Sequence, residues 1–419
     1  MRNTSTLVPV DKYNIVYIII LIQGIGTLLP WNMFITANDY FVWKLTPNNG
    51  TNETIHDDDL LQYKDNFPSY VGIASKLPNT CIQVANFLIH SKGGSLKLRI
   101  LVSLVFQIAI FAVTIGLAIP DSSNWIATFF GVTIVCVVVA NIWNGISLNC
   151  LYGQAATMPA KYMNALVIGL NSSGLVTSLF MIVALAAAPD LRTTAIVYFT
   201  TAVLFLIVCF VTYIHLMKSE YFNHFLNLKK ENVRDDGMYA KAATRPPYLL
   251  ILKQIWVHLF NLFFVYFISQ ALFPAVLAGI VSTPSLGGKY FTVVSCFLTY
   301  SMFVTLGNIA VDFAPTLIQT RHLWIWVLGR MIFIPYFLFC NFKPKTRTVP
   351  VIFHSDTFYI IGVILFALIS GYMQSLALTA APKSVVPQHS SIAGMMSSFM
   401  LMVGIATGIT SSLLFANLV

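Results

Sequence analysis

The sequence contains very little charge. Asp, Glu, Lys and Arg make up 9% of its 419 residues, whereas soluble proteins average about 25%. Hydrophobic residues make up 57% of the chain, and the mean hydropathy is +0.77. The 15 acidic and 24 basic side chains are too few to cover a water-soluble protein of this size. The composition therefore predicts a membrane protein and excludes soluble enzymes, nucleic-acid-binding modules and secreted disulfide-linked scaffolds.

Several kinds of chemical site are also missing. All 6 cysteines fall within apolar runs, without the spacing of a disulfide framework or a metal site. The chain has no phosphate-binding glycine loop for ATP and no motif of a catalytic triad. No Asp or Glu lies deep in an apolar run, which argues against a proton relay or a cation carrier. We therefore expect no enzyme activity, cofactor or metal, and passive movement of a mainly neutral solute.

The chain does contain a series of apolar runs near 20 residues long. Each run is continuous rather than alternating, and as a helix it can cross a hydrocarbon core of roughly 30 Å. The polar start of the chain shows no removable signal peptide. We predict eleven transmembrane helices, at 14–37, 69–90, 99–119, 124–150, 163–188, 194–217, 253–280, 291–311, 323–341, 357–380 and 392–416. They form a bundle of six helices (1–217), a cytoplasmic linker (218–252) and a bundle of five (253–419).

The loops indicate the orientation of these helices. With the N-terminus in the cytoplasm, the inner segments hold about twice as many Lys and Arg residues as the outer ones, as the positive-inside rule requires. The first outer loop then carries two glycosylation acceptors, at Asn49 and Asn52. The odd number of helices places the C-terminus outside. No acidic dileucine signal precedes the first helix, which favours the plasma membrane.

Polar residues are frequent inside the predicted helices. The fourth and fifth helices share a set of amide side chains, namely Asn141, Asn144, Asn149, Gln154, Asn164 and Asn171. Each amide on its own is explained by interhelical hydrogen bonding, but the density of the set favours a polar cavity. Two charged residues, Lys76 and Arg330, lie well inside helices, where charge is costly and indicates a functional role.

Several motifs resemble those of the equilibrative nucleoside transporters. They are GIGTLLPWN at 24–32, FPAV at 273–276, VSCFLT at 294–299, the residues Arg330, Pro335, Cys340 and Asn341, the pair Gly371-Tyr372, and APK at 381–383. The resemblance extends from about Asp11 to the C-terminus. It implies a fold like that of the major facilitators, with two helix bundles rocking around a central path. It also implies transport of nucleosides, and in some members of nucleobases, down their gradient.

The same resemblance implies roles for particular residues. Trp31 would line the pocket and touch the base or sugar, and Leu28 and Ile35 would flank it. The full set implied to bind substrate is Leu28, Trp31, Ile35, Lys76, Asn79, Leu148, Asn149, Phe273, Ser301, Val304 and Asn308. The residues implied to serve packing and transport are Gly169, Gly174, Arg330 and Gly371.

The sequence departs from the family at recognition positions. Leu148 and Asn149 stand where the family usually has Gln and Gly, and Val304 and Asn308 stand where it has Asp and Arg. The loss of both members of this charged pair has two interpretations. One is a balanced exchange that leaves no single charge stranded. The other is a change of specificity, with Lys76 compensating for the lost polar groups. We therefore expect a carrier of nucleosides or nucleobases in a lipid bilayer, without nucleic acid or ATP as partners. The alternatives are a carrier of another small polar or anionic solute and a non-transporting sensor or assembly subunit.

Overall fold

A computed structural model of the chain describes residues 9–46, 67–90, 95–122, 125–188, 190–227, 248–273, 275–280, 291, 293–342 and 350–417. The regular structure of these residues is helical. The α-helices are α1 (Ile15–Thr36), α2 (Asn38–Lys44), α4 (Phe67–His90), α5 (Leu96–Ala118), α6 (Ile126–Ala155), α7 (Ala160–Ala187), α8 (Leu191–Lys218), α10 (Tyr248–Leu272), α11 (Ala275–Ala278), α12 (Thr299–Phe313), α13 (Leu323–Gly329), α14 (Phe333–Leu338), α15 (Asp356–Lys383) and α16 (Ser390–Asn417). The predicted glycosylation sites Asn49 and Asn52 lie outside the described residues.

Nine helical segments in the described part of the chain are long and apolar enough to cross a membrane. They are Lys12–Thr36, Leu96–Ala118, Ile126–Ala155, Ala160–Ala187, Leu191–Lys218, Tyr248–Ala278, Val294–Phe313, Asp356–Lys383 and Pro387–Ser412. Their most apolar windows have mean hydropathies between 1.6 and 2.5. Such segments form helices because lipid offers the backbone no hydrogen-bond partner, so each N–H and C=O must be paired within the segment. The prediction of an all-helical integral membrane protein is confirmed.

Two predicted spans differ from these nine segments. The second predicted span, 69–90, is the continuous helix α4. Its polar residues make it less apolar than the nine segments above. The ninth span, 323–341, is broken into α13, a 3-10 turn at Arg330–Ile332 called η4, and α14. Pro335 explains part of this break, because a proline has no N–H to donate to the carbonyl four residues earlier.

The ends of other predicted segments also shift. The helix α8 ends at Lys218, residues 220–227 are helical, and α10 already begins at Tyr248. Helix therefore extends into both ends of the predicted linker at 218–252, whose residues 228–247 lie outside the described part. The eighth span begins with a π-helical turn, η2 (Val293–Leu298), and continues as α12, which includes Asp312 in its last turn. The predicted eighth span ends at residue 311, just before Asp312. In the structure Asp312 is inside the helix.

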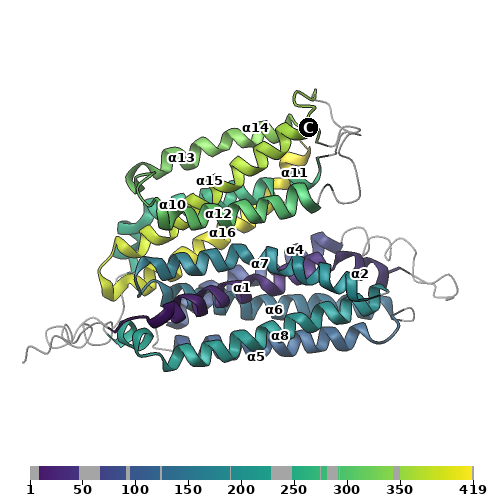
Figure 1. Ribbon diagram of the computed structural model, residues 1–419, viewed down its shortest axis with the longest axis horizontal. Coiled ribbons are helices and arrows are strands. Elements are labelled where there is room, and N and C mark those ends of the chain that lie inside the picture. The colour runs from purple at the N-terminus through teal and green to yellow at the C-terminus, as the bar shows by residue number, and fades with distance from the viewer. Residues whose placement is uncertain are drawn as a thin grey trace, which may run out of the picture.

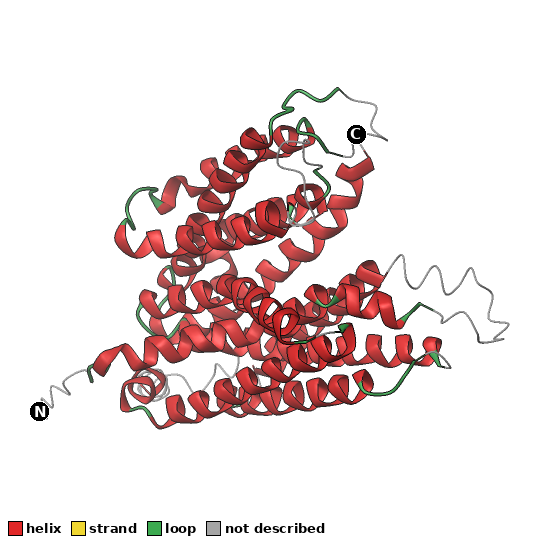
Figure 2. Cartoon of the chain, turned by 45° about the vertical axis from the view of Figure 1, so that its right-hand side comes forward, coloured by secondary structure: helices red, strands yellow, loops and turns green. Residues whose placement is uncertain are grey.

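The helices lie in two groups. Figure 1 shows α1 to α8 together in the lower half and α10 to α16 together in the upper half. In Figure 2 the ribbons of the two groups lie close together on the left and further apart on the right. The main contacts that join the groups are α6 with α16, α4 with α16, and α7 with both α12 and α15. These four helix pairs position the polar residues described below.

Within each group, glycines allow helices to cross closely. A Cβ on Gly169 of α7 would lie 2.2 Å from the carbonyl oxygen of Leu21 in α1. A Cβ on Gly371 of α15 would lie 2.0 Å from the carbonyl oxygen of Val304 in α12. Both distances are far inside van der Waals contact, so only glycine fits at these crossings. Gly169 and Gly371 are therefore packing residues of the fold.

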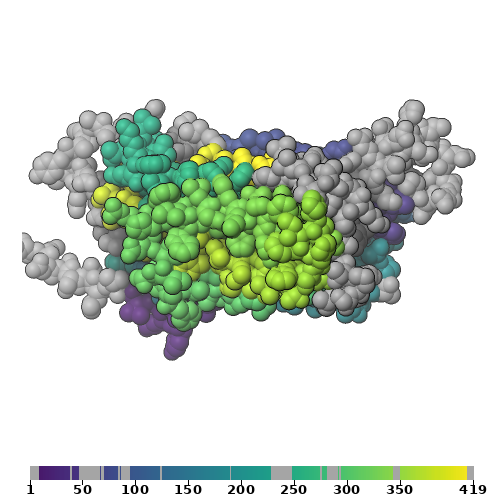
Figure 3. Space-filling model, turned by 90° about the horizontal axis from the view of Figure 1, so that it is seen from above, coloured from purple at the N-terminus to yellow at the C-terminus, as the bar shows by residue number. Residues whose placement is uncertain are grey.

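The outer surface of the second group is apolar. Figure 3 shows this face from above, where α13, α14 and α15 cover much of the molecule. Large side chains exposed on α13, η4 and α15 include Trp324, Trp326, Ile332, Phe358 and Leu365. A water-soluble protein rarely exposes so many large apolar side chains together, whereas a helix bundle in lipid does so on every lipid-facing side. The surface thus agrees with the composition.

Candidate functional site

Trp31 and Lys76 form the most unusual contact inside the first group of helices. Trp31 follows Pro30 in α1, Lys76 lies two residues before Pro78 in α4, and both side chains are half-buried. The Lys76 ammonium Nζ lies 3.9 Å from the centroid of the Trp31 ring. A cation at this distance is attracted by the electron-rich face of the indole. The structure therefore brings together the two residues that the sequence marked as aromatic and cationic members of one site.

Asn79 lies one turn after Lys76 on α4 and is 1% exposed. Its Oδ1 accepts a hydrogen bond of 2.8 Å from Gln83 Nε2, whose Oε1 in turn accepts one of 2.9 Å from Ser398 Oγ in α16. The Asn79 Nδ2 is buried without a partner among the described residues. This chain of side chains links the first group of helices to the second.

Leu148 and Asn149 are buried in the second half of α6, with 1% and 0% exposure. The Asn149 Nδ2 donates a hydrogen bond of 3.1 Å to the Met395 carbonyl in α16. A Cβ on Gly153, one turn further along, would lie 2.9 Å from Met395 Cγ. Asn149 and Gly153 therefore lie on the face of α6 that packs against α16, and the Asn149 amide joins the two groups.

Further amides of α7 join the groups in the same way. The Asn164 Nδ2 donates to Asp312 Oδ1 at 2.8 Å and to the Asn308 carbonyl at 3.2 Å. Two turns later the Asn171 Nδ2 donates to Gln374 Oε1 of α15 at 3.1 Å. These bonds run from α7 to α12 and α15, so this row of amides spans the junction between the groups rather than packing within one of them.

Val304 and Asn308 face α15 across the close crossing at Gly371. They are 2% and 0% exposed, and a Cβ on Gly371 would lie 2.0 Å from the Val304 carbonyl and 3.0 Å from the Asn308 backbone nitrogen. The Asn308 Oδ1 accepts a hydrogen bond of 3.0 Å from Ser375 Oγ, while its Nδ2 has no partner among the described residues. The Asn308 Nδ2 is therefore a donor that the described residues leave unused.

Arg330 is 2% exposed and its guanidinium is engaged inside the second group. One nitrogen donates to the Val265 carbonyl at 3.2 Å, and another donates to the hydroxyls of Ser269 and Ser370. The guanidinium carbon also lies 5.0 Å from the centroid of the Phe366 ring. These contacts join η4 to α10 and α15, so Arg330 holds the broken ninth span against these two helices.

The remaining predicted site residues lie in different surroundings. The Phe273 ring stacks on Tyr300 with centroids 4.1 Å apart, within the second group. A Cβ on Gly174 of α7 would lie 3.1 Å from Ser301 Oγ in α12, so these two residues meet between the groups. Leu28 packs against the larger apolar core and Ile35 is half-buried near the end of α1. The structure therefore groups the predicted residues into several contacts rather than one cluster.

Sequence reasoning missed several polar partners at the junction. Gln83, Ser398, Gln374 and Ser375 complete the hydrogen bonds of residues that the sequence did mark. A signal for two of them was present, because Gln374 and Ser375 follow Gly371 by three and four residues and so share its helix face. No group of three His, Cys, Asp or Glu side chains in the described segments could hold a metal ion.

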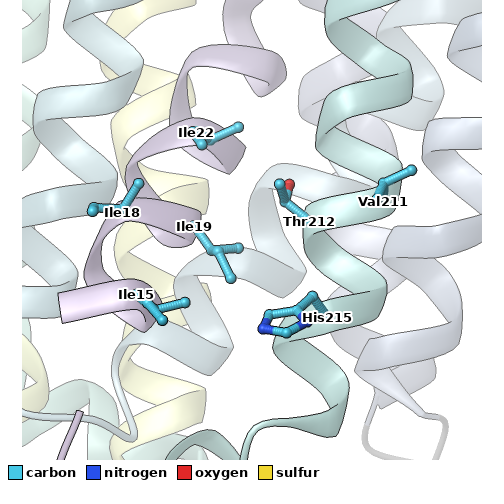
Figure 4. Close-up of a pocket in the computed structure, with 7 residues that line it drawn as sticks. All are labelled: Ile15, Ile18, Ile19, Ile22, Val211, Thr212 and His215. Atoms are coloured by element: carbon cyan, nitrogen blue, oxygen red, sulfur yellow. The ribbon is translucent and has the colours of Figure 1, made fainter. Parts of the chain in front are cut away.

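One surface hollow lies away from all of these residues. It has a volume of about 340 Å³ and lies between α1 and α8 (Figure 4). Its lining consists of Ile15, Ile18, Ile19, Ile22, Val211, Thr212 and His215. One hydroxyl and one imidazole offer little to a polar solute, and none of the predicted site residues lines the hollow. It is therefore distinct from the polar junction.

Comparisons with known proteins agree with the sequence motifs. A family model described as nucleoside transporter matches residues 134–417. The chain is 30% identical to human equilibrative nucleoside transporter 1, over 99% of this chain and 100% of that protein. It is 29% identical to mouse equilibrative nucleoside transporter 2, over 98% of each chain. It is also 27% identical to equilibrative nucleotide transporter 1 of Arabidopsis thaliana, over 96% of this chain and 86% of that protein.

Solved structures resemble the fold at low sequence identity. The proton:xylose symporter XylE of the major facilitator superfamily matches with a TM-score of 0.60 and 11% identity, covering 93% of this chain and 85% of that chain. The transporter FucP in its outward conformation matches with a TM-score of 0.56 and 11% identity, covering 96% and 97%. These matches show a fold like that of the major facilitators.

Proposed function

The chain belongs to the nucleoside transporter family, and from that premise we propose that it carries nucleosides, with nucleobases as further substrates, passively across a membrane. The family model and relatives matching nearly the whole chain support the class of solute. The major-facilitator-like fold supports transport by two groups of helices that expose one site alternately to each side. The family and the fold both support a transporter rather than an enzyme.

The observation that carries this proposal is the Trp31–Lys76 contact beside the polar junction. A nucleoside offers a flat base that stacks on an aromatic face and a base edge and sugar that form hydrogen bonds. Trp31 supplies such a face, and Lys76 and Asn79 supply donors on the neighbouring helix α4. The amides at the junction belong to helices of both groups, so substrate bound there would contact both.

We propose the further site residues that the resemblance to the family implies. Leu28 and Ile35 lie on α1, three residues before and four residues after Trp31, and so share its face of the helix. Ser301 approaches Gly174 between the two groups. The other proposed contacts to substrate are Asn79, Leu148, Asn149, Phe273, Val304 and Asn308, and the proposed packing and transport residues are Gly169, Gly174, Arg330 and Gly371.

The proposed architecture has eleven transmembrane helices. The nine apolar segments, α4, and the broken helix of η4 with α13 and α14 together make this number. Six precede the linker at 218–252 and five follow it, giving bundles at 1–217 and 253–419. The proposed orientation has a cytoplasmic N-terminus, an extracellular C-terminus and glycosylation at Asn49 and Asn52 in the plasma membrane.

The proposal of passive transport rests on where the carboxylates lie. Among the described residues of the long apolar segments, the acidic side chains are Asp312 and Asp356, and both lie at helix ends. Asp312 accepts a hydrogen bond from Asn164. Coupling to protons or cations in a carrier uses carboxylates along the path. We therefore propose a uniporter.

The experiment that tests this function is uptake of labelled uridine, adenosine and hypoxanthine by cells that lack their own carriers. Cells expressing the chain should take up at least one of them with saturable kinetics, independently of sodium. The matched control is the Trp31→Ala variant, with the amount of surface protein measured in both. Equal uptake by expressing and empty cells for all three solutes would contradict the proposal.

A further inference from the structure

Lys76 carries three N–H donors that the protein does not use. Among the residues that the structure describes, its ammonium contacts the Trp31 ring and has no hydrogen-bond acceptor or carboxylate. The side chain is half-buried, so part of its surface stays open to a ligand. Arg330, the other cation well inside a predicted span, already donates to three acceptors. Lys76 is therefore equipped to donate to a ligand.

The neighbouring amide offers the same chemistry. Asn79 lies three residues after Lys76, so the two side chains share a face of α4. The Asn79 Oδ1 is occupied by Gln83, whereas its Nδ2 has no partner and the residue is 1% exposed. An ammonium has donors and no acceptor. The polar groups that this face of α4 leaves unpaired are thus donors.

Nucleobases differ in what their edges present to such donors. Guanine presents the acceptors O6 and N7 and thymine presents O4, whereas adenine presents an N6 amino donor beside N7 and cytosine presents an N4 amino donor. Hypoxanthine has O6 in place of the amino group of adenine, and uracil has O4 in place of the amino group of cytosine. A donor pair opposite an amino group leaves both sides without an acceptor, and an unmet polar group in a buried site is costly.

We propose that Lys76 is a specificity-determining residue that makes this carrier prefer oxo bases, such as hypoxanthine, guanine and uracil, over amino bases, such as adenine and cytosine. This inference rests on the proposed function as a nucleoside carrier. The ammonium lies over the Trp31 ring, 3.9 Å from its centroid, so a base that stacks on this face displaces the ammonium toward the edge of the base. The flexible four-carbon stem lets the ammonium follow that edge.

The test compares two pairs of substrates that differ at one exocyclic group. Uptake of inosine is measured against adenosine, and uptake of uridine against cytidine, in cells without their own nucleoside carriers. The variants are Lys76→Met, which keeps the length of the side chain and removes its donors, and Lys76→Arg, which keeps donors and charge. The control is Lys161→Met, because Lys161 also lies over an aromatic ring, Tyr162 at 4.9 Å, but is exposed.

Wild type should favour inosine over adenosine and uridine over cytidine by about ten-fold, the value of one hydrogen bond to a charged group. Lys76→Met should bring both ratios close to one at equal surface protein, whereas Lys76→Arg and Lys161→Met should keep the preference. Equal uptake within both pairs by wild type would overturn the inference, even if Lys76→Met does not reach the surface. So would an unchanged preference in a Lys76→Met variant that transports.

The failure of the inference and the failure of the proposed function give different results. A wild type that transports nucleosides without regard to the exocyclic group keeps the proposed function and refutes the role of Lys76. A wild type at normal surface levels that transports none of the four nucleosides refutes both.

Discussion

Replacing Gly371 with alanine is expected to force α12 and α15 apart. The new Cβ would lie 2.0 Å from the Val304 carbonyl oxygen and 2.9 Å from its carbon, whereas ordinary contact begins at 3.4 Å. Both obstacles are backbone atoms, which cannot turn away as the end of a flexible side chain can. The helices must therefore separate by about 1.4 Å at this point.

The cost of this separation follows from the packing that it disrupts. A gap of 0.5–1 Å already removes about a quarter to a half of the dispersion energy across it. Forced enlargement in a packed interior typically costs about 1–3 kcal/mol, and the separation at Gly371 belongs at the upper end. At roughly 2 °C per kcal/mol for a large domain, the variant should melt about 5 °C below wild type. The backbone of Asn308, 3.0 Å from the same Cβ position, should move with α12 and lower uptake as well.

Gly116 in α5 and Gly131 in α6 provide matched controls. A Cβ at either position would meet nothing within 4 Å, and alanine is the better helix former by about 1 kcal/mol. Gly116→Ala and Gly131→Ala should therefore melt at or slightly above the wild-type temperature. Melting is measured on purified protein in detergent by tryptophan fluorescence. If Gly371→Ala melts with the two controls, the close crossing of α12 and α15 is wrong.

Three further variants test the site. Trp31→Ala should abolish uptake while Trp31→Phe keeps part of it, because the base needs an aromatic face; uptake per surface molecule decides, and normal uptake by the alanine variant would remove Trp31 from the site. Val304→Asp with Asn308→Arg should strengthen uptake of nucleosides, whereas each single change strands one buried charge and should inactivate; a single change that equals the pair would show that the positions are uncoupled. Asn164→Asp should lower uptake by setting a second carboxylate 2.8 Å from Asp312, and adding Asp312→Asn should restore part of it, because the Asn308 carbonyl still lacks its donor; uptake no higher in the double variant than in the single one would contradict a role for this bond.

The helices themselves could be predicted from the sequence because their lengths are set by the bilayer. A continuous apolar run must pair its own backbone in lipid, and nine of the predicted spans correspond to the nine apolar helical segments. The broken ninth span could not be predicted in this way. Pro335 marks a weak point in this otherwise apolar run, but η4 forms at Arg330, whose guanidinium reaches acceptors on α10 and α15.

The site was predictable as a set of residues and not as a set of contacts. Lys76 was marked by its charge inside a helix and Trp31 by the motif at 24–32, yet 45 positions separate them, and only the packing of α1 against α4 sets the 3.9 Å between them. Asn164 was recognised as a polar residue, but its partner Asp312 was placed outside the helix. Hydropathy records how apolar a segment is and does not record which helix faces meet.

The measurement that tests the central claim most directly is the equilibrium distribution of an unmetabolised nucleoside across vesicles containing the purified protein. Labelled uridine or inosine is added outside, with sodium or proton gradients imposed in either direction. The account predicts protein-dependent entry that ends at equal inside and outside concentrations under every gradient. An internal concentration that rises above the external one and follows a gradient would contradict passive transport, and no entry beyond that of protein-free vesicles would contradict nucleoside transport itself.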